Sequence, residues 1–511
     1  MSPTKSMVII GAGVAGLSAG CYARMNGYDA TIIEMHTLPG GVCTSWRRGD
    51  YLFDHCLHWV IGSNKGNTLY PIFEELGVAQ AVQFYHTERF RRIEAGGKTL
   101  TVYTNLDRFE AELLRLFPAE ARAIRKFIGL VRFYTGFKPP LDADFGQFGP
   151  SDMLKMLPYM PSFLRLKGIT IEAFLARTFR DPALREMLFQ MFPVRSLPAL
   201  MAVMPLAYFH NHEGGYPLGG SLRLARALER RFLDLGGAIQ YGQKVERILV
   251  KGCRAAGVAL QNGEEVRADI VISACDGRST LYGMLGGRHL TPRLRKMYEN
   301  PSLWPPIISV SLGVNRDLTG EVEIQNFALD RPVRIADRMV DRLGFFHYCH
   351  DPAFAPRGKS VVEMQIETDY CYWRDLYADR KKYGAEKERV LAACLDVLET
   401  RLPGIKSQVE AADVATPVTW ERYTGNWRGS YEGWLPTVAL FGRMLPRELP
   451  GLRDFYMTGQ WVSPGGGVPM CMAQGRRLIK LIRQKEGGSF TAGVPRRFMS
   501  NHTPDERRPL S

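Results

Sequence analysis

Three glycines and one acidic residue near the start of the chain have the types and spacing that a dinucleotide requires. Gly11, Gly13 and Gly16 directly follow the apolar run "MVII", and Glu34 ends the next apolar run, "DATIIE". In this pattern the first glycine allows a tight turn, the second lets the backbone approach a pyrophosphate, and the third lets helix and strand pack closely. An acid roughly 20 residues further on accepts hydrogen bonds from ribose hydroxyls. The contacts expected here are Gly11, Gly13, Val14, Ala15, Gly16 and Glu34.

The residues around this first glycine turn predict a strand, a helix and a second strand. "MVII" is typical of a strand buried on both faces, and the residues after Gly16 have a helical pattern that ends at Gly27. The free N–H groups at the start of such a helix bind phosphate. An acid at Glu34 disfavours a 2′-phosphate, and with it NADP. FAD and NAD both remain open on these residues alone.

Two further glycine-rich segments favour FAD over NAD. Gly40 and Gly41 follow the ribose acid closely, where an NAD dehydrogenase needs no such pair. "GQWVSPGGGVPMCMAQG" (459–475) places another glycine turn before a basic amphipathic helix. FAD is too long for one phosphate turn to hold at both ends, so the last turn is expected to face the ribityl chain and the flavin. N–H groups near Val468–Met470 would stabilise negative charge on reduced flavin. The contacts expected from these segments are Gly40, Gly41, Gly459, Gly467, Val468 and Met470.

The order of these motifs resembles the flavin amine oxidase superfamily, and within it the phytoene desaturase, carotenoid isomerase and retinol saturase group. "PGGGVPMCMAQGRR" is similar to that group's "HPGGGIPG" turn, and "ATPVTWERYTGNWRGSYEGW" (415–434) resembles its return from the substrate domain. The resemblance implies FAD as cofactor, an apolar polyene, isoprenoid or lipid-like substrate, and a place in carotenoid or isoprenoid synthesis. It also implies that the backbone of Val245 contacts the adenine. Val42, Ser463 and Cys275 depart from the group's usual residues. These departures leave the exact reaction undecided, but they do not change the expectation that the cofactor is a flavin.

Asp54 and His58 are the candidate catalytic bases. Both lie in "YLFDHCLHWVIGS" (51–63), which resembles the saturase and isomerase pattern and follows a segment that leads towards the flavin. A hydrogen-bonded histidine in the wall of the site is the alternative for His58. His55, Cys56 and His58 are the nearest approach to a metal site, but no second pair of ligands accompanies them, so no metal is expected.

The expected fold is α/β, with a discontinuous Rossmann-type FAD-binding domain and a mixed α+β substrate domain. The chain is long enough for two or more domains. The FAD-binding domain is expected from residues 1–75, 210–290 and 446–486, and the substrate domain from residues 76–209 and 291–445. Residues 487–511 are interpreted as a disordered tail. "SLWPPIISVSLGV" (302–314) and "KSVVEMQIET" (359–368) predict strands that roof the site.

The amino-acid composition of the chain limits the kinds of partner that it can be expected to bind. The net charge of +14 is compatible with nucleic acid, an anionic membrane or anionic substrates, but the basic residues are scattered among apolar ones and no nucleic-acid motif is present, so no nucleic acid is expected. Nine dispersed cysteines without a C-x-x-C pair favour a reducing compartment, and no signal peptide is recognised, which predicts a cytoplasmic protein. No apolar run reaches the roughly 20 residues of a membrane-spanning helix.

The insert at 76–209 combines helical patterns with methionine and basic side chains. One interpretation is an apolar tunnel whose mouth contacts an anionic membrane through amphipathic helices; the other is an ordinary helical cap. Three functions stay open. The favoured one is desaturation, saturation or isomerisation of an apolar chain by hydride transfer with flavin N5. The others are oxidation of C–N bonds, as by an amine oxidase, and a non-catalytic flavin-holding protein.

Overall fold

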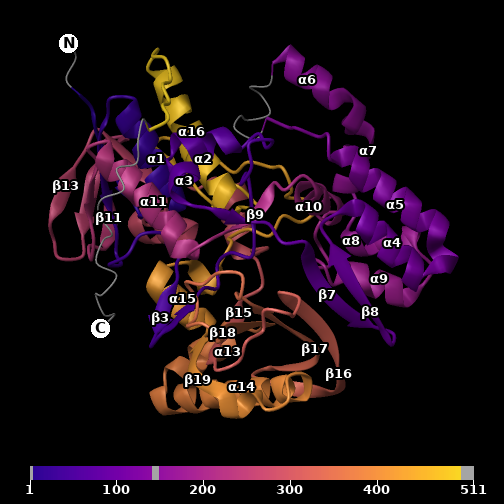
Figure 1. Ribbon diagram of the computed structural model, residues 1–511. Helices are drawn as coiled ribbons and strands as arrows, with labels where there is room; N and C mark the ends of the chain where they lie inside the picture. Colours follow the sequence, from indigo (N-terminus) through magenta and orange to yellow (C-terminus); the bar gives the residue numbers. More distant parts are fainter. Residues whose placement is uncertain (1–3, 141–148, 496–511) are drawn as a thin grey trace.

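The computed structural model describes residues 4–140 and 149–495 (Figure 1), and one half of it is built on a five-stranded parallel sheet. Its strands come from three separated stretches of the chain. In spatial order they are β10 (Ala238–Gln240), β2 (Asp29–Ile33), β1 (Ser6–Ile10), β14 (Ile270–Ser273) and β20 (Phe455–Met457). The first strand, helix α1 (Val14–Met25) and the second strand form the βαβ unit that the sequence predicts, with β1 and β2 in parallel register.

Each face of this sheet packs against a different layer. Met7 and Ile9 pack in one cluster with helices, whereas Val8 and Ile10 pack in another, because successive side chains of a strand point to opposite faces. The helices are α1, α11 (Ser221–Asp234) and α16 (Gly467–Lys485). The other layer is an antiparallel sheet of β11 (Val245–Lys251), β12 (Arg254–Leu260) and β13 (Glu265–Arg267), with a turn at Asn262 and Gly263 joining the last two.

A seven-stranded sheet forms the core of the second half of the molecule. Its order is β19 (Val409–Ala415), β15 (Ile307–Val314), β18 (Ser360–Glu367), β17 (Arg338–His347), β16 (Ile324–Ile335), β7 (Arg89–Ala95) and β8 (Lys98–Tyr103). Val310 and Leu312 pack with α13 (Tyr370–Tyr377) and α14 (Arg380–Arg401) on one face. Ser309 and Ser311 alternate with them and are buried on the other face. The two strands predicted at 302–314 and 359–368 are confirmed as β15 and β18, which pair antiparallel.

Seven α-helices of the described part of the chain lie in the stretch between β8 and β9 (Figure 1). They are α4 (Leu106–Leu116), α5 (Ala121–Tyr134), α6 (Pro150–Met156), α7 (Met160–Lys167), α8 (Ile171–Thr178), α9 (Pro182–Phe189) and α10 (Leu200–His210). Nearly every residue of α10 is buried. The helical patterns of this region are confirmed, but the β7–β8 hairpin was not predicted: its strands are short and gain their partner, β16, from a distant part of the chain.

The remaining elements connect these layers. They include β3 (Trp46–Arg48), β4 (Tyr51–Phe53), β5 (Val60–Ile61), α2 (Tyr70–Glu75), α3 (Val78–Ala81), β6 (Phe84–Tyr85), β9 (Gly214–Pro217), α12 (Pro292–Glu299) and α15 (Pro417–Thr424). The segment 51–63, which carries the candidate bases, passes between the parallel sheet and the seven-stranded sheet, since the main chain of Leu52 and Asp54 bonds to residues beyond 350.

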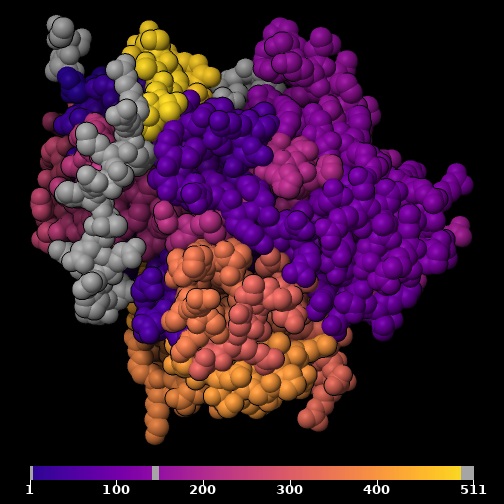
Figure 2. All heavy atoms as spheres, in the orientation of Figure 1, coloured from indigo at the N-terminus to yellow at the C-terminus, as the bar shows by residue number. Residues whose placement is uncertain are grey.

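The prediction that a disordered tail begins at residue 487 is wrong. Phe490 packs against Tyr22 with ring centroids 5.8 Å apart, and Asn26 exchanges two hydrogen bonds of 2.8 Å with the main chain of Thr491. Arg231 donates a hydrogen bond to the carbonyl of Gly493. The ring contact of Phe490 and the hydrogen bonds of Asn26 and Arg231 with main-chain groups therefore hold residues 487–495 against α1 and α11. Residues 496–511 of the predicted tail lie outside the described residues, which appear in colour in Figure 2.

Candidate active site

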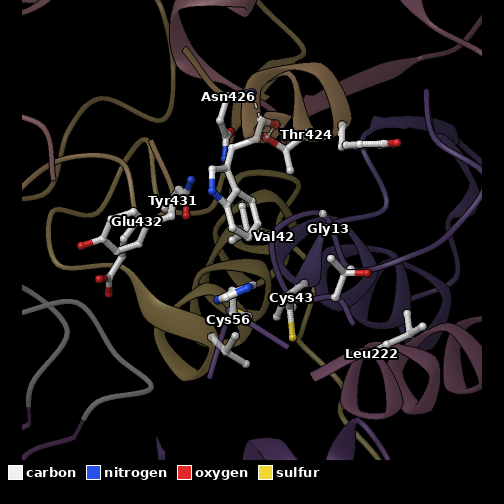
Figure 3. A pocket seen from close by; sticks show the side chains of 18 of the residues that line it. Gly13, Val42, Cys43, Cys56, Leu222, Thr424, Asn426, Tyr431 and Glu432 are labelled. Carbon is white, nitrogen blue, oxygen red and sulfur yellow. Dashed lines mark hydrogen bonds between the residues drawn. The ribbon is translucent and has the colours of Figure 1, made fainter. Parts of the chain in front are cut away.

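One cavity of about 3000 Å³ extends from the first glycine turn to the helical region. A site for one small molecule usually measures about 300–1,000 Å³. The wall near the parallel sheet includes Gly13, Glu34 and Val245, and the opposite end includes Phe192, Met201 and Pro205. The cavity therefore has room for a dinucleotide and for a second, elongated molecule. Figure 3 shows Gly13 and Leu222 on one side of the pocket and Tyr431 and Glu432 on the other.

The geometry of the first glycine turn fits a pyrophosphate. Gly11 has a φ of +99°, and its N–H donates to the carbonyl of Ile33 over 2.8 Å. At Gly16 an added Cβ would stand 2.0 Å from the Gly11 carbonyl oxygen, so the helix can approach the strand only without a side chain. At Gly13 the only atom within 4 Å of an added Cβ is the Gly40 carbonyl oxygen, at 3.9 Å. Helix α1 begins beside this open space and has no acid in its first turn, which suits a phosphate.

Glu34 stands at the cavity wall, where a ribose would lie. One carboxylate oxygen accepts from the Ala12 N–H over 2.6 Å and the other from the His36 N–H over 2.8 Å. Burial raises the pKa of Glu34, while these N–H groups act in the opposite direction. Each oxygen keeps a second lone pair for a hydroxyl donor.

The second glycine pair runs beside the first turn. The Gly40 N–H donates to the Ala12 carbonyl over 2.8 Å, and Gly40 forms a parallel bridge with Gly13. Gly40 has a φ of +108°, and an added Cβ would stand 2.1 Å from the Cys43 carbonyl oxygen. Gly41 lies so close to the first turn that its added Cβ would be 3.5 Å from the Gly13 Cα. Gly40 is thus required for the close approach of this segment, and Gly41 has a φ of +62°, in the left-handed region that favours glycine.

The last glycine turn lies against the first. Gly459 has a φ of +91°, and an added Cβ would stand 3.0 Å from the Ala15 Cβ. Helix α16 packs along α1, where the Ser18 hydroxyl donates to the Met472 carbonyl over 2.7 Å. The first turn of α16 contains no acid, and Val468 and Met470 line the cavity. In the first turn of α16, Gly467, Val468 and Met470 each carry an N–H, whereas Pro469 has none.

The two turns are therefore two ends of one cavity. Twelve of the predicted cofactor contacts line it: Gly11, Gly13, Val14, Ala15, Glu34, Gly40, Gly41, Val245, Gly459, Gly467, Val468 and Met470. Gly16 packs α1 against β1 instead. An FAD fits this arrangement, with its pyrophosphate at α1, its ribose at Glu34 and its flavin towards α16.

The two candidate bases are placed differently. Asp54 does not belong to the described lining of the cavity; its carboxylate accepts from the Ser221 N–H and, over 2.7 Å, from the Ser221 hydroxyl at the start of α11. It also accepts from the Cys56 N–H over 3.0 Å. Burial raises the pKa of Asp54 to about 6. This position suits a structural role.

His58 lies in the wall of the large cavity. Its ring meets that of Phe346 edge to face with centroids 4.5 Å apart, and burial lowers its pKa to about 4. Among the described residues its Nε2 has no hydrogen-bond partner. The ring is therefore neutral at pH 7 and available as a proton acceptor. His55, Cys56 and His58 do not converge on one point, and within residues 4–140 and 149–495 no group of His, Cys, Asp and Glu has the arrangement of a metal site.

A buried polar cluster lies behind this segment and was not predicted. His55 Nε2 lies 2.5 Å from the Ser311 hydroxyl, and its Nδ1 lies 3.3 Å from a carboxyl oxygen of Glu363. Glu363 also accepts from the Asp54 N–H and the Tyr348 hydroxyl over 2.9 and 3.1 Å. Burial raises the pKa of Glu363 and lowers that of His55 to about 3. The signal in the sequence was an acid, Glu363, in the middle of the otherwise apolar run of the strand "SVVEMQIE".

Glu432 is a second carboxyl that sequence reasoning missed. It lines the large cavity with Tyr431 and Trp304, near the start of α16. Burial raises its pKa to about 7. Nothing in "SYEGW" distinguishes this acid from a solvated one, because its surroundings come from elements far along the chain.

Comparisons with known proteins agree with this geometry. The model of the family "Flavin containing amine oxidoreductase" matches residues 14–478. The prolycopene isomerase of Daucus carota is 26% identical over 90% of this chain and 77% of its own length. The 4,4'-diapophytoene desaturase of Methylomonas sp. is 24% identical over 96% of this chain and 97% of its own. Among solved structures, an oxidoreductase from Methanosarcina mazei matches with a TM-score of 0.62 and 16% identity, covering 93% of this chain and all of the other.

The matched family region begins within the first glycine turn, at residue 14, and extends through the last glycine turn and the segments between them. Its extent, together with a cavity wall that fits the pyrophosphate, ribose and flavin, identifies the cofactor as FAD. The chain belongs to the flavin containing amine oxidoreductase family and is an FAD-dependent oxidoreductase.

Proposed function

We propose that this oxidoreductase acts on carbon–carbon bonds of an apolar polyene or isoprenoid chain, by desaturation, saturation or isomerisation. The observation that carries the proposal is the apolar part of the cavity beyond the flavin end. That part is lined by Leu57, Trp59, Ile61, Phe192, Leu197, Met201 and Pro205. A long apolar chain is held there by burial of its surface, worth about 25 cal/mol per Å², and needs no polar partner.

The names of two relatives support the same class, since one is a prolycopene isomerase and the other a 4,4'-diapophytoene desaturase. Bound FAD supplies hydride exchange at the flavin N5. The chain's own residues hold the substrate in line, exclude water and provide a proton acceptor, for which His58 is the sequence-based candidate. We also assign the five-stranded parallel sheet to a Rossmann-type FAD-binding domain.

The test is anaerobic incubation of the FAD-loaded protein with prolycopene and with 4,4'-diapophytoene, once with oxidised and once with reduced flavin. Product analysis by chromatography is expected to show a change in double-bond number or geometry in at least one case. Release of peroxide with a panel of primary amines in air, and unchanged polyenes, would instead support C–N oxidation. An unreactive flavin throughout would support a flavin-holding role.

We further propose that the polyene reaches the cavity from an anionic membrane surface. None of the helices in the described part of the chain is long and apolar enough to cross a membrane. Helices α6 and α7 and the short 3-10 helix between them (Leu157–Tyr159), however, stand at the outside of the molecule (Figure 1) and expose large apolar side chains. These are Met153 (56% exposed), Leu154 (71%), Leu157 (64%) and Leu164 (59%). Lys155 and Arg165 lie among them, as expected for a helix surface that contacts anionic lipid.

Replacing Leu154, Leu157 and Leu164 together by serine is expected to weaken binding to anionic vesicles at least about tenfold. Burial of a leucine side chain is worth about 1.5–3 kcal/mol, and 1.4 kcal/mol is a factor of ten. Co-sedimentation with vesicles that contain anionic lipid measures this. Leu233→Ser, on α11, is the control because Leu233 is also exposed. Equal sedimentation of the triple variant and the wild type would contradict the proposal.

A further inference from the structure

The main chain fixes Glu432 above the first turn of α16. The Gly433 N–H donates to the Ser430 hydroxyl over 3.0 Å, and the Gly433 carbonyl accepts from the Trp304 N–H over 3.1 Å. One carboxyl oxygen of Glu432 lies 3.4 Å from the point where a Cβ on Gly467 would stand. The carboxyl therefore lies at the end of the cavity that faces the flavin.

This carboxyl has unusual surroundings. Within residues 4–140 and 149–495 no hydrogen bond and no ion pair reaches it, and the residue is only partly buried because it lines the open cavity. Its neighbours with titratable groups are Tyr431 on the same loop and Cys471 on α16, and burial raises the pKa of both. Glu367 on β18 lies further away, near Tyr431. Trp304 packs beside Tyr431 with ring centroids 5.9 Å apart.

Burial without a partner favours the neutral form of the carboxyl and raises the pKa of Glu432 to about 7. A carboxyl with this pKa exists in both forms at neutral pH, so it can donate a proton and accept one. The two candidates from the sequence do not combine this property with a place in the cavity wall. Asp54, with a pKa raised to about 6, lies outside the described cavity lining, and the His58 ring, with a pKa of about 4, is not in its acidic imidazolium form at neutral pH.

We propose that Glu432 is the acid–base catalyst that protonates and deprotonates a polyene double bond in this cavity. The inference rests on the proposed function and names the residue that performs its isomerisation chemistry. The Oε–H bond breaks, and the two π electrons of a C=C bond form a new C–H bond to that proton. The resulting carbocation is delocalised along the polyene and turns about what is now a single bond. A C–H bond then breaks, its electron pair restores the double bond, and the proton returns to the Glu432 carboxylate. No oxidant or reductant is consumed.

The test compares Glu432→Gln with Glu432→Asp and with Glu299→Gln, a control that removes an exposed acid on α12. The FAD-loaded proteins are incubated with prolycopene in D₂O. Glu432→Gln is expected to lower the isomerisation rate at least about 100-fold, because general acid–base catalysis contributes about 10²–10⁴. Glu432→Asp is expected to restore part of the rate. Wild-type product is expected to carry deuterium at vinylic carbons.

A second readout needs no turnover. Infrared spectra of the cofactor-free protein are expected to show a protonated-carboxyl band that disappears on raising the pH through about 7, and this band is expected to be missing in Glu432→Gln. Full activity and deuterium uptake in Glu432→Gln, or an unchanged titrating band, would overturn the assignment of Glu432. A wild-type protein that binds FAD and leaves prolycopene unchanged would instead overturn the proposed isomerisation itself.

Discussion

Replacement of Gly13 by valine is expected to abolish FAD binding while the protein remains folded. Gly13 has φ −66° and ψ 169°, which any residue can adopt, and its surroundings leave room for a side chain. That room is where the pyrophosphate must approach the N–H groups of α1. A valine there would displace the phosphates from the helix N-terminus, and we expect FAD affinity to fall by at least about 100-fold, or 2.8 kcal/mol.

Visible absorbance after reconstitution with FAD measures this, and the thermal midpoint of the cofactor-free protein reports the fold. Gly129→Val is a matched control, since Gly129 is exposed on α5 and has no neighbour within 4 Å of an added Cβ. Gly16→Val is the opposite case and should destabilise the fold, because its Cβ would stand 2.0 Å from a carbonyl oxygen. A flavin-loaded Gly13→Val protein of wild-type affinity would show that the pyrophosphate lies elsewhere.

Replacement of Asp54 by alanine is expected to lower the free energy of unfolding by about 3–5 kcal/mol. The carboxylate accepts from the buried N–H and hydroxyl of Ser221 and from the partly buried Cys56 N–H. Each buried donor left without an acceptor costs about 1–3 kcal/mol. Urea unfolding measures the loss. Turnover per folded, FAD-loaded molecule should change only a few-fold; a stable variant without turnover would make Asp54 a catalytic base.

The Asp54 carboxyl also gives this stability a pH dependence. Burial raises its folded-state pKa to about 6, above the ordinary value of 3.8, so the folded protein holds this proton more tightly than the unfolded chain. The contribution of the Asp54 carboxyl to the free energy of unfolding is therefore largest below about pH 4 and declines as the pH rises to about 6. The stability difference between wild type and Asp54→Asn should change over this range and be constant above it.

The cofactor site could be predicted from the sequence because its chemistry is carried by the backbone. A glycine that must let a phosphate or a strand approach leaves a local signature. Gly16 and Gly40 are required by contacts seen in the structure, and Gly11 is favoured by its φ of +99°. Likewise, apolar runs such as "IISVSLGV" predict buried strands wherever they pair.

The sequence could not show in the same way which acidic or basic side chain is the catalytic one. The setting of Glu432 depends on Trp304 and on the start of α16, which lie more than 30 residues away in either direction. His55 meets Glu363 only because β18 pairs in the middle of the seven-stranded sheet. Burial, and not residue type, decides which carboxyl is protonated at neutral pH, and burial of these groups arises from tertiary packing.

The most direct test of the account is a titration of the cofactor-free protein with FAD and, separately, with FMN, followed by flavin fluorescence. The central claim is that the first and last glycine turns hold the two ends of one dinucleotide. It predicts that FAD binds at least about 100-fold more tightly than FMN, because FMN lacks the adenosine half that Glu34 and Val245 would hold. Equal affinities for FMN and FAD would contradict the claim.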